Sequence, residues 1–396
     1  MKKKIGIVLV LMLIFVGGIN SSVFADIDQQ DPMFIDLIRT ASIEDIKESV
    51  DSGASVNSTD AWGTTALMTA VAYRNDKELI EFFLDEGANV NAKNDHGLSA
   101  LLMGVQYAQS EIIELLLEKG AEVDDRNQSG ETPIMLASKN VDNPKVIELL
   151  LDKGADVSVR NEDGKTVLMF AVQNVKDAKY IELLIEKGAE VSTKDINGMD
   201  SLMYAARNNT NPEVIQTIID ESADINSRDK EGFTALMDAA GHNSVEIVEL
   251  LLDEGADVNT RSQEGFTALI IAAAHSNNPI MIEKLVDKGA NINARDGEGL
   301  NALMNAAWFN SNPEIIESLI ETGIDVNSEG PNGETALMIA AANTYYPEII
   351  ESLLKNGADG SMKCNFGRTA FDYASEYNEW LEGEDIFWRL NDAQYD

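Results

Sequence analysis

The chain has 396 residues, of which 44% are hydrophobic, and it carries 68 acidic against 30 basic residues, a formal net charge of −38. With 28 glycines and only 8 prolines, this balance excludes a disordered or collagen-like chain and predicts an ordered protein with a sizeable core. Such acidity would repel nucleic acid and attract a basic protein partner, the alternative being an acidic surface with no particular target.

The first 25 residues have the features of an export signal. Three lysines at positions 2–4 precede an apolar run over residues 5–16, and small residues stand at Val23 and Ala25. This order predicts a signal peptide over residues 1–25, and the apolar run is shorter than the ~20 residues that span a bilayer. We expect an exported protein, periplasmic or secreted, without stable membrane insertion after signal cleavage; an uncleaved anchor is the alternative.

Two sequence anchors recur every 33 or 34 residues through the rest of the chain. One is a Gly-Ala-acidic-Val-polar signature, in which Ser222 replaces glycine once. Its glycines are Gly53, Gly87, Gly120, Gly154, Gly188, Gly255, Gly289, Gly323 and Gly357. The other begins as Thr65-Ala66-Leu67-Met68 and keeps the same spacing. Such a regular period is the signature of a repeat protein.

Each unit predicts two helices. A short Ala-rich helix precedes a turn and a second helix such as residues 246–252, where apolar and acidic residues alternate at helical spacing. We expect the second helix to end at its glycine, which adopts a positive φ without steric cost. Asn-Pro pairs at 143–144, 211–212, 278–279 and 312–313 mark the starts of second helices, with Asn as N-cap. The extra residue of the 34-residue units is expected in the turn between the helices.

These features resemble the ankyrin repeat. Residues 229–240, with the sequence DKEGFTALMDAA, match the family's Asp-x-x-Gly-x-Thr-Pro-Leu-His-x-Ala-Ala opening, and the resemblance covers about residues 31–396. It implies an all-α ankyrin-repeat solenoid of stacked helix-turn-helix units with projecting β-hairpin loops. The chain then divides into an N-terminal capping repeat over 26–57, nine tandem ankyrin repeats over 58–362 and a C-terminal capping repeat over 363–396.

Two hydrophobic groups depart from the family pattern. Methionine mostly replaces the family's histidine, and we expect these methionines to fill the core, a soft-metal site being the alternative. They are Met68, Met135, Met169, Met203, Met237, Met304 and Met338. In the last unit we expect Trp380, Leu381, Phe387, Trp388 and Leu390 to form the core of the cap, the alternative being that the tryptophans form a docking patch.

No pattern of catalytic or metal-ligating residues is recognised. His96, His242 and His275 fall in different repeats, without Cys or Asp at zinc-site spacing, and the lone Cys364 cannot form an internal disulfide. The repeats leave no segment for a second domain. We therefore predict no catalytic residues, no metal, no cofactor and no enzyme activity; an undetected hydrolase is the alternative.

The resemblance implies that a partner binds in the concave groove, at the hairpin tips, at the residue after each hairpin glycine and at the two positions after Ala-Ala on each first helix. In the middle of the chain these positions are apolar, aromatic or histidine, which is typical of binding hot spots. We predict a protein-binding patch of Met199, Phe233, His242, Phe266, His275, Leu300, Trp308 and Phe309. The alternative is that Phe233 and Phe266 only pack the hairpins onto the helices.

The leading hypothesis is a non-catalytic protein–protein interaction scaffold that acts in the periplasm or outside the cell. The alternative is a structural or protective accessory of an exported enzyme or envelope assembly. The sequence leaves the partner and the oligomeric state open.

Overall fold

The computed structural model describes residues 31–139 and 144–395. These residues form 22 α-helices and one 3-10 helix. The signal peptide predicted over residues 1–25 lies outside the described residues. The chain divides into two compact units, Met1–Gln128 and Ser129–Asp396.

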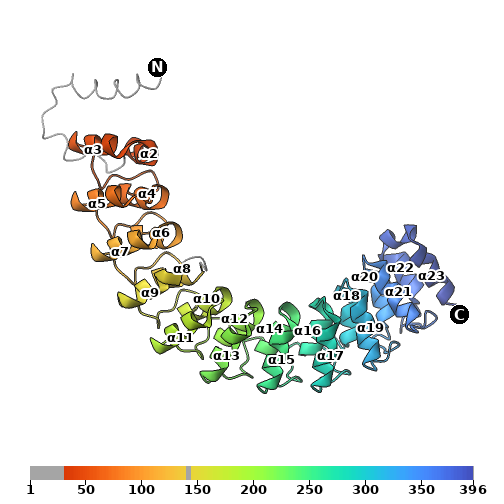
Figure 1. Ribbon diagram of the computed structural model, residues 1–396. Coiled ribbons are helices and arrows are strands. Elements are labelled where there is room, and N and C mark those ends of the chain that lie inside the picture. The colour runs from red at the N-terminus through yellow and green to blue at the C-terminus, as the bar shows by residue number, and fades with distance from the viewer. Residues whose placement is uncertain (1–30, 140–143, 396) are drawn as a thin grey trace. The chain divides into compact units, whose positions relative to one another are not determined.

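The first unit contains three helix pairs (Figure 1). Helices α2 and α4 pack on one another, as do α4 and α6, while α5 packs on α7 in a second layer. The pairs are α2 (Pro32–Thr40) with α3 (Ile43–Asp51), α4 (Ala66–Tyr73) with α5 (Lys77–Asp85), and α6 (Ala100–Tyr107) with α7 (Ser110–Glu118).

The second unit continues the same alternation of first and second helices. Its first helices are α8 (Pro133–Lys139), α10 (Val167–Asn174), α12 (Ser201–Asn208), α14 (Ala235–His242), α16 (Ala268–His275), α18 (Ala302–Phe309), α20 (Ala336–Asn343) and α22 (Ala370–Tyr377). Its second helices are α9 (Pro144–Asp152), α11 (Ala178–Glu186), α13 (Pro212–Asp220), α15 (Val245–Asp253), α17 (Pro279–Asp287), α19 (Pro313–Glu321) and α21 (Pro347–Lys355). After α22, a 3-10 helix η2 (Glu379–Gly383) and α23 (Asp385–Ala393) end the described chain.

The core lies between the two helix layers of each unit. First helices are buried almost all round: every residue of α16 except His275 is buried. Second helices bury one stripe, such as Ile247, Val248 and Leu251 of α15, and leave their acidic residues in solvent. The methionines predicted as core filler are all at most 1% exposed, so that prediction is confirmed.

Local chemistry sets where the helices end, as predicted. Asn211, Asn278 and Asn312 cap α13, α17 and α19 by accepting a backbone N–H, each with Pro at the first helical position. The signature glycines have positive φ, for example 95° at Gly255, and Ser222 adopts 67° in the same position. The Asn143 cap predicted for α9 lies outside the described residues.

The extra residue of the longer units lies in the turn between the two helices, as predicted. Three residues join α16 to α17, whereas only Asn243 and Ser244 join α14 to α15 in a 33-residue unit. Because the helices keep their lengths, a change of one residue in the period alters only an exposed connection and leaves the packed layers unchanged.

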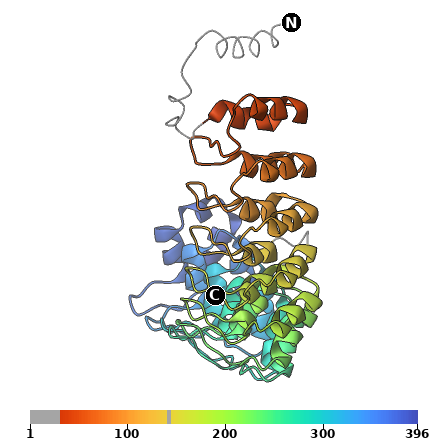
Figure 2. The same cartoon turned by 90° about the vertical axis from the view of Figure 1, so that its left-hand side faces the viewer.

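The projecting loops are tight turns without strand ladders. Within the described residues the only β-bridge joins Thr59 and Thr65. Most loops are instead closed by two backbone bonds, such as Asp229 N–H to the Phe233 carbonyl at 3.0 Å and Gly232 N–H to the Asp229 carbonyl at 3.1 Å. Loops of successive repeats bond to each other: Lys230 N–H donates to the Asn197 carbonyl at 2.8 Å. Figure 2 shows these loops extending to one side of the helices in the second unit.

The C-terminal cap differs from the prediction in its tryptophans. Leu381, Phe387 and Leu390 are buried, but Trp380 is 45% and Trp388 61% exposed. The prediction that both tryptophans form cap core is therefore wrong. Helix α23 buries positions 386, 387 and 390, a stripe that excludes position 388, because residues two apart on a helix face away from each other.

Candidate functional site

The candidate surface is formed by the first helices of the second unit and the loops that precede them, and is termed the first-helix surface below. Each repeat contributes the residue after the loop glycine, a residue in the middle of the first helix and the last residue of that helix. In one repeat these are Phe233, Asp238 and His242. The Asp229 carboxylate holds the loop against the helix, since it accepts the backbone N–H groups of Glu231 and Phe233.

Three of the predicted site residues form one aromatic cluster. The rings of Trp308 and Phe309 stack with centroids 5.4 Å apart and planes 7° apart. The His275 imidazole lies 6.2 Å from the Phe309 ring. Trp308 is 40% and Phe309 56% exposed, so the cluster presents aromatic surface to solvent at the ends of α16 and α18.

Two other predicted residues are not exposed. Met199 and Leu300 are only 6% and 4% accessible, so the expectation that solvent reaches this position is wrong for both. In both loops a carboxylate closes the turn: Asp195 accepts the Met199 N–H and Asp296 the Leu300 N–H, both at 2.9 Å. Asp229 accepts the Phe233 N–H in the same way, so burial at this position depends on how each side chain packs and not on the loop bond. Phe233 and Phe266 are half-buried at the same position.

The two predicted histidines differ in what surrounds them. Both are exposed, and the His242 Nδ1 lies 3.2 Å from the Asp238 carbonyl oxygen. Burial lowers the pKa of His275, and the charge of His242 lowers it further. The lowered pKa favours the uncharged imidazole, whose ring lies tilted against Phe309.

An ion pair that the sequence analysis missed lies beside these residues. The Arg207 guanidinium donates to Asp238 Oδ1 from Nε at 2.9 Å and from Nη2 at 2.5 Å. Asp238 is 2% exposed, and its Oδ2 has no hydrogen-bond partner among the described residues. Burial raises the pKa of Asp238 to about 6, although Arg207 acts in the opposite direction.

Cations cover aromatic rings earlier along the same surface. Lys139 Nζ lies 4.6 Å from the Phe170 ring centroid, and Lys165 Nζ lies 4.9 Å from that of Tyr204. The Tyr204 hydroxyl donates to Asp195 Oδ2 at 2.7 Å. Lysines thus lie over aromatic rings around α8 to α12, and carboxylates accompany them, since Lys139 also pairs with Glu131.

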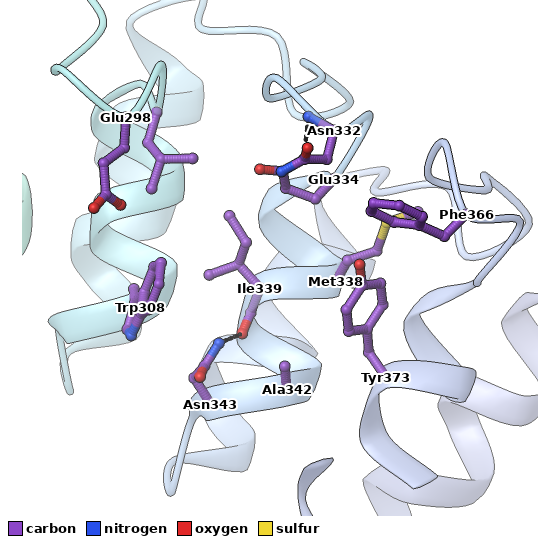
Figure 3. Close-up of a pocket in the computed structure, with 11 residues that line it drawn as sticks. Glu298, Trp308, Asn332, Glu334, Met338, Ile339, Ala342, Asn343, Phe366 and Tyr373 are labelled. Atoms are coloured by element: carbon purple, nitrogen blue, oxygen red, sulfur yellow. Dashed lines mark hydrogen bonds between the residues drawn. The ribbon is translucent and has the colours of Figure 1, made fainter. Parts of the chain in front are cut away.

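A hollow of about 410 Å³ opens between α18, α20 and α22 (Figure 3). Trp308 and Glu298 stand on one side, Phe366 and Tyr373 on the other, and Ile339 lies between them. Leu300 also lines it, so its small accessible area faces this hollow. Of the predicted patch, the structure thus places Leu300 and Trp308 around one concave site.

Comparison with known families agrees with this architecture. A family model of three ankyrin repeats matches residues 37–127, 123–195, 202–296 and 297–390. The chain belongs to the ankyrin-repeat family. A search of curated proteins found no match. Ankyrin repeats are generic protein–protein interaction modules and are typically non-catalytic.

The residues missed in the ankyrin sequence share one position. Phe170, Tyr204, Asp238 and Tyr373 each follow directly the first-helix position that methionine or its replacement occupies. Their spacing of one repeat, with mixed aromatic and charged character on a buried helix, was a signal that could have located this column. In these four repeats the ankyrin groove therefore includes this mid-helix position, besides the loops and the last positions of the first helix.

The described parts of the ankyrin chain hold neither a candidate metal site nor a candidate membrane-spanning helix. In residues 31–139 and 144–395, no three His, Cys, Asp or Glu side chains are grouped so that they could hold a metal ion. None of the described helices is long and apolar enough to cross a membrane. Cys364 is a buried free thiol that lies 3.6 Å from the Tyr373 hydroxyl.

Proposed function

We propose that the chain is a non-catalytic scaffold that binds a protein partner across its first-helix surface. The observation that carries this proposal is the exposed aromatic cluster of His275, Trp308 and Phe309 beside the hollow. Grouped aromatic side chains next to a concave site are the usual composition of interface hot spots. The helices beneath them are fully packed, so little conformational freedom is lost on binding.

The partner that we propose is basic. The net charge of −38 creates an attractive field for a cationic surface and repels other polyanions. Complementary charge mainly raises the association rate, and this effect falls as salt screens the field. The aromatic cluster would then supply the short-range contacts that hold the complex.

We propose further that the chain acts outside the cytoplasm. The support is the leader itself, in which lysines 2–4 precede the apolar run over 5–16 and the small residues Val23 and Ala25. N-terminal sequencing of the protein recovered from envelope and culture-medium fractions tests this, with Asp26 as the expected first residue. Recovery of the chain only from the cytoplasm, with residue 1 retained, would contradict it.

A pull-down with paired variants tests the binding surface. The chain from Asp26 onward is immobilised and incubated with envelope and supernatant fractions, and retained proteins are quantified by mass spectrometry. The Trp308→Ala, Phe309→Ala variant should retain the specific partner at least about tenfold less, because two hot-spot aromatics are removed.

The matched control changes two aromatic residues outside the first-helix surface. Tyr345 and Trp388 are 71% and 61% exposed, and the Tyr345→Ala, Trp388→Ala variant should retain the partner like the unmodified chain. Equal retention by the Trp308, Phe309 variant and the unmodified chain would refute the proposed site. Circular dichroism of both variants checks that the helices remain folded.

A further inference from the structure

The hollow beside Trp308 lies where the bonding between successive loops is interrupted. From residue 129 to residue 297 each loop donates one backbone N–H to the loop before it, as in Gln263 to the Glu231 carbonyl at 2.8 Å. Residue 331 occupies the next donor position, and Pro331 has no N–H. Among the described residues no hydrogen bond to the Glu298 carbonyl replaces the missing one.

A second connection between loops ends at the same place. Arg228 Nη2 donates to the Arg261 carbonyl at 2.6 Å, and Arg261 Nη2 donates to the Arg295 carbonyl at 2.5 Å. Arg295 donates instead to the Gly299 carbonyl of its own loop at 2.6 Å, and the next residue in this column is Glu329. The loop that follows therefore brings a carboxylate where earlier loops bring a guanidinium.

Two carboxylates with no cationic partner stand at the rim of this hollow. Glu298 is exposed, and Glu334 is half-buried with Oε2 accepting the Asn332 N–H at 2.8 Å. In the part of the chain that the structure describes, neither carboxylate forms an ion pair. Figure 3 shows both at the loop end of the hollow, above the aromatic walls.

The walls between these carboxylates and the helices are aromatic and aliphatic. Trp308 forms one wall, held by the Phe309 ring that stacks on it, and Phe366 and Tyr373 form the other. Ile339 lies between the walls. The site therefore combines anionic oxygens at its mouth with apolar surface below, which complements an elongated side chain that has an aliphatic stem and a cationic end.

We propose that this hollow binds an arginine side chain of a basic protein partner. The inference rests on the proposed function and names the chemistry of the partner. A guanidinium has five N–H donors in a plane, which suits carboxylate acceptors at the mouth of the hollow, and it stacks on an aromatic ring such as that of Trp308. A lysine ammonium carries the same charge but lacks the planar face, so it satisfies fewer of these groups.

Three capped tripeptides test this inference without knowledge of the partner. Acetyl-Gly-Arg-Gly-amide is titrated into the chain that begins at Asp26, and the methyl resonances of Met338 and Ile339 are followed by NMR. The lysine and norleucine tripeptides are the comparisons, because norleucine keeps the aliphatic stem without a charge. We expect saturable shifts with arginine, roughly threefold weaker binding with lysine and about tenfold weaker binding with norleucine.

A matched pair of variants separates local recognition from net charge. Glu298→Gln, Glu334→Gln should weaken binding of the arginine tripeptide about tenfold. Glu231→Gln, Glu264→Gln removes two charges at the loop position of Glu298 in the two preceding repeats, and it should leave binding within about twofold. Trp308→Leu keeps an apolar wall but removes the π face, and it should weaken the arginine tripeptide more than norleucine.

Equal binding of arginine and norleucine, or equal effects of the two glutamate pairs, would overturn the inference. Its failure is distinguishable from failure of the proposed function. A partner whose retention depends on Trp308 and Phe309 but not on Glu298 and Glu334 would support the binding surface and refute arginine recognition. Selective arginine binding with no dependence of partner retention on Trp308 would refute the proposed surface instead.

Discussion

Asp238 is a buried carboxyl at a position where nearby repeats place a hydrogen-bond donor. The Tyr204 hydroxyl donates to Asp195 Oδ2, and the Asn305 amide donates to Asp296 Oδ2 at 2.8 Å. Asp238 offers only acceptors when ionised, and its Oδ2 has no partner among the described residues. Burial raises its pKa to about 6; Arg207 opposes this shift and the Asp229 carboxylate adds to it.

This carboxyl should make stability depend on pH between about 4 and 6. Because the pKa in the folded state lies above the unfolded value, the folded state holds an extra proton in this window, and stability falls as pH rises through it. Asp238→Asn should therefore raise the free energy of unfolding at pH 7 by about 1–2 kcal/mol. Urea unfolding at several pH values measures the free energy of unfolding of both proteins. The stability gained by Asp238→Asn should become smaller toward pH 4.

The converse substitution serves as its control. Asn305→Asp places a second carboxylate against Asp296 and removes the 2.8 Å bond, so it should destabilise the protein at pH 7 and less at pH 4. If Asp238→Asn destabilised the protein equally at pH 7 and pH 4, the buried Asp238 charge would not be what lowers stability at pH 7. Such a result would show that the Arg207 pair outweighs the burial of the charge.

At the scale of the helix pair, asparagines in four of the turns tie their repeats to the preceding ones. Asn310 Nδ2 donates to the carbonyls of Ala273 and Ser276 at 2.8 and 2.9 Å. Asn209, Asn243 and Asn378 make the same two bonds in their repeats, and Arg74 does so in the first unit. These bonds satisfy carbonyls at the ends of first helices.

Ser276 occupies this turn position but is too short to make the two bonds; its hydroxyl instead bonds within its own turn. Ser276→Asn should reach the carbonyls of Ala240 and Asn243, by the spacing that Asn310 follows, and should raise the free energy of unfolding by about 1 kcal/mol. Thermal unfolding followed by circular dichroism measures this.

Asn310→Ser is the matched reverse change. It leaves the carbonyls of Ala273 and Ser276 without their donor, and should cost about 2 kcal/mol. If Ser276→Asn lowered the melting temperature while Asn310→Ser left it unchanged, the turn bonds would not be what couples adjacent repeats.

For the whole molecule, the sequence predicted what depends on local chemistry. The helix pairs, the Asn N-caps and the residue added to each longer turn follow from residues that lie beside the feature they determine. The prediction that Trp388 is buried was wrong because the side of α23 that is buried is decided only when the helix packs. The burial of Met199 was not predicted because it depends on packing in the folded chain: Phe233 makes the same loop bond and is half-buried. The Arg207–Asp238 pair was missed because it joins two repeats.

The net charge of −38 is also a property of the whole chain, and it predicts how stability responds to salt. Repulsion among like charges destabilises the compact state, whereas exposed ion pairs such as Lys119 with Asp85 contribute little. Raising NaCl from about 10 to about 150 mM shortens the screening length from about 30 to about 8 Å, so it should weaken repulsion more than contact pairs. We expect the melting temperature to rise by a few degrees, equally in NaCl and KCl. A fall over this range would mean that the exposed ion pairs together outweigh the repulsion.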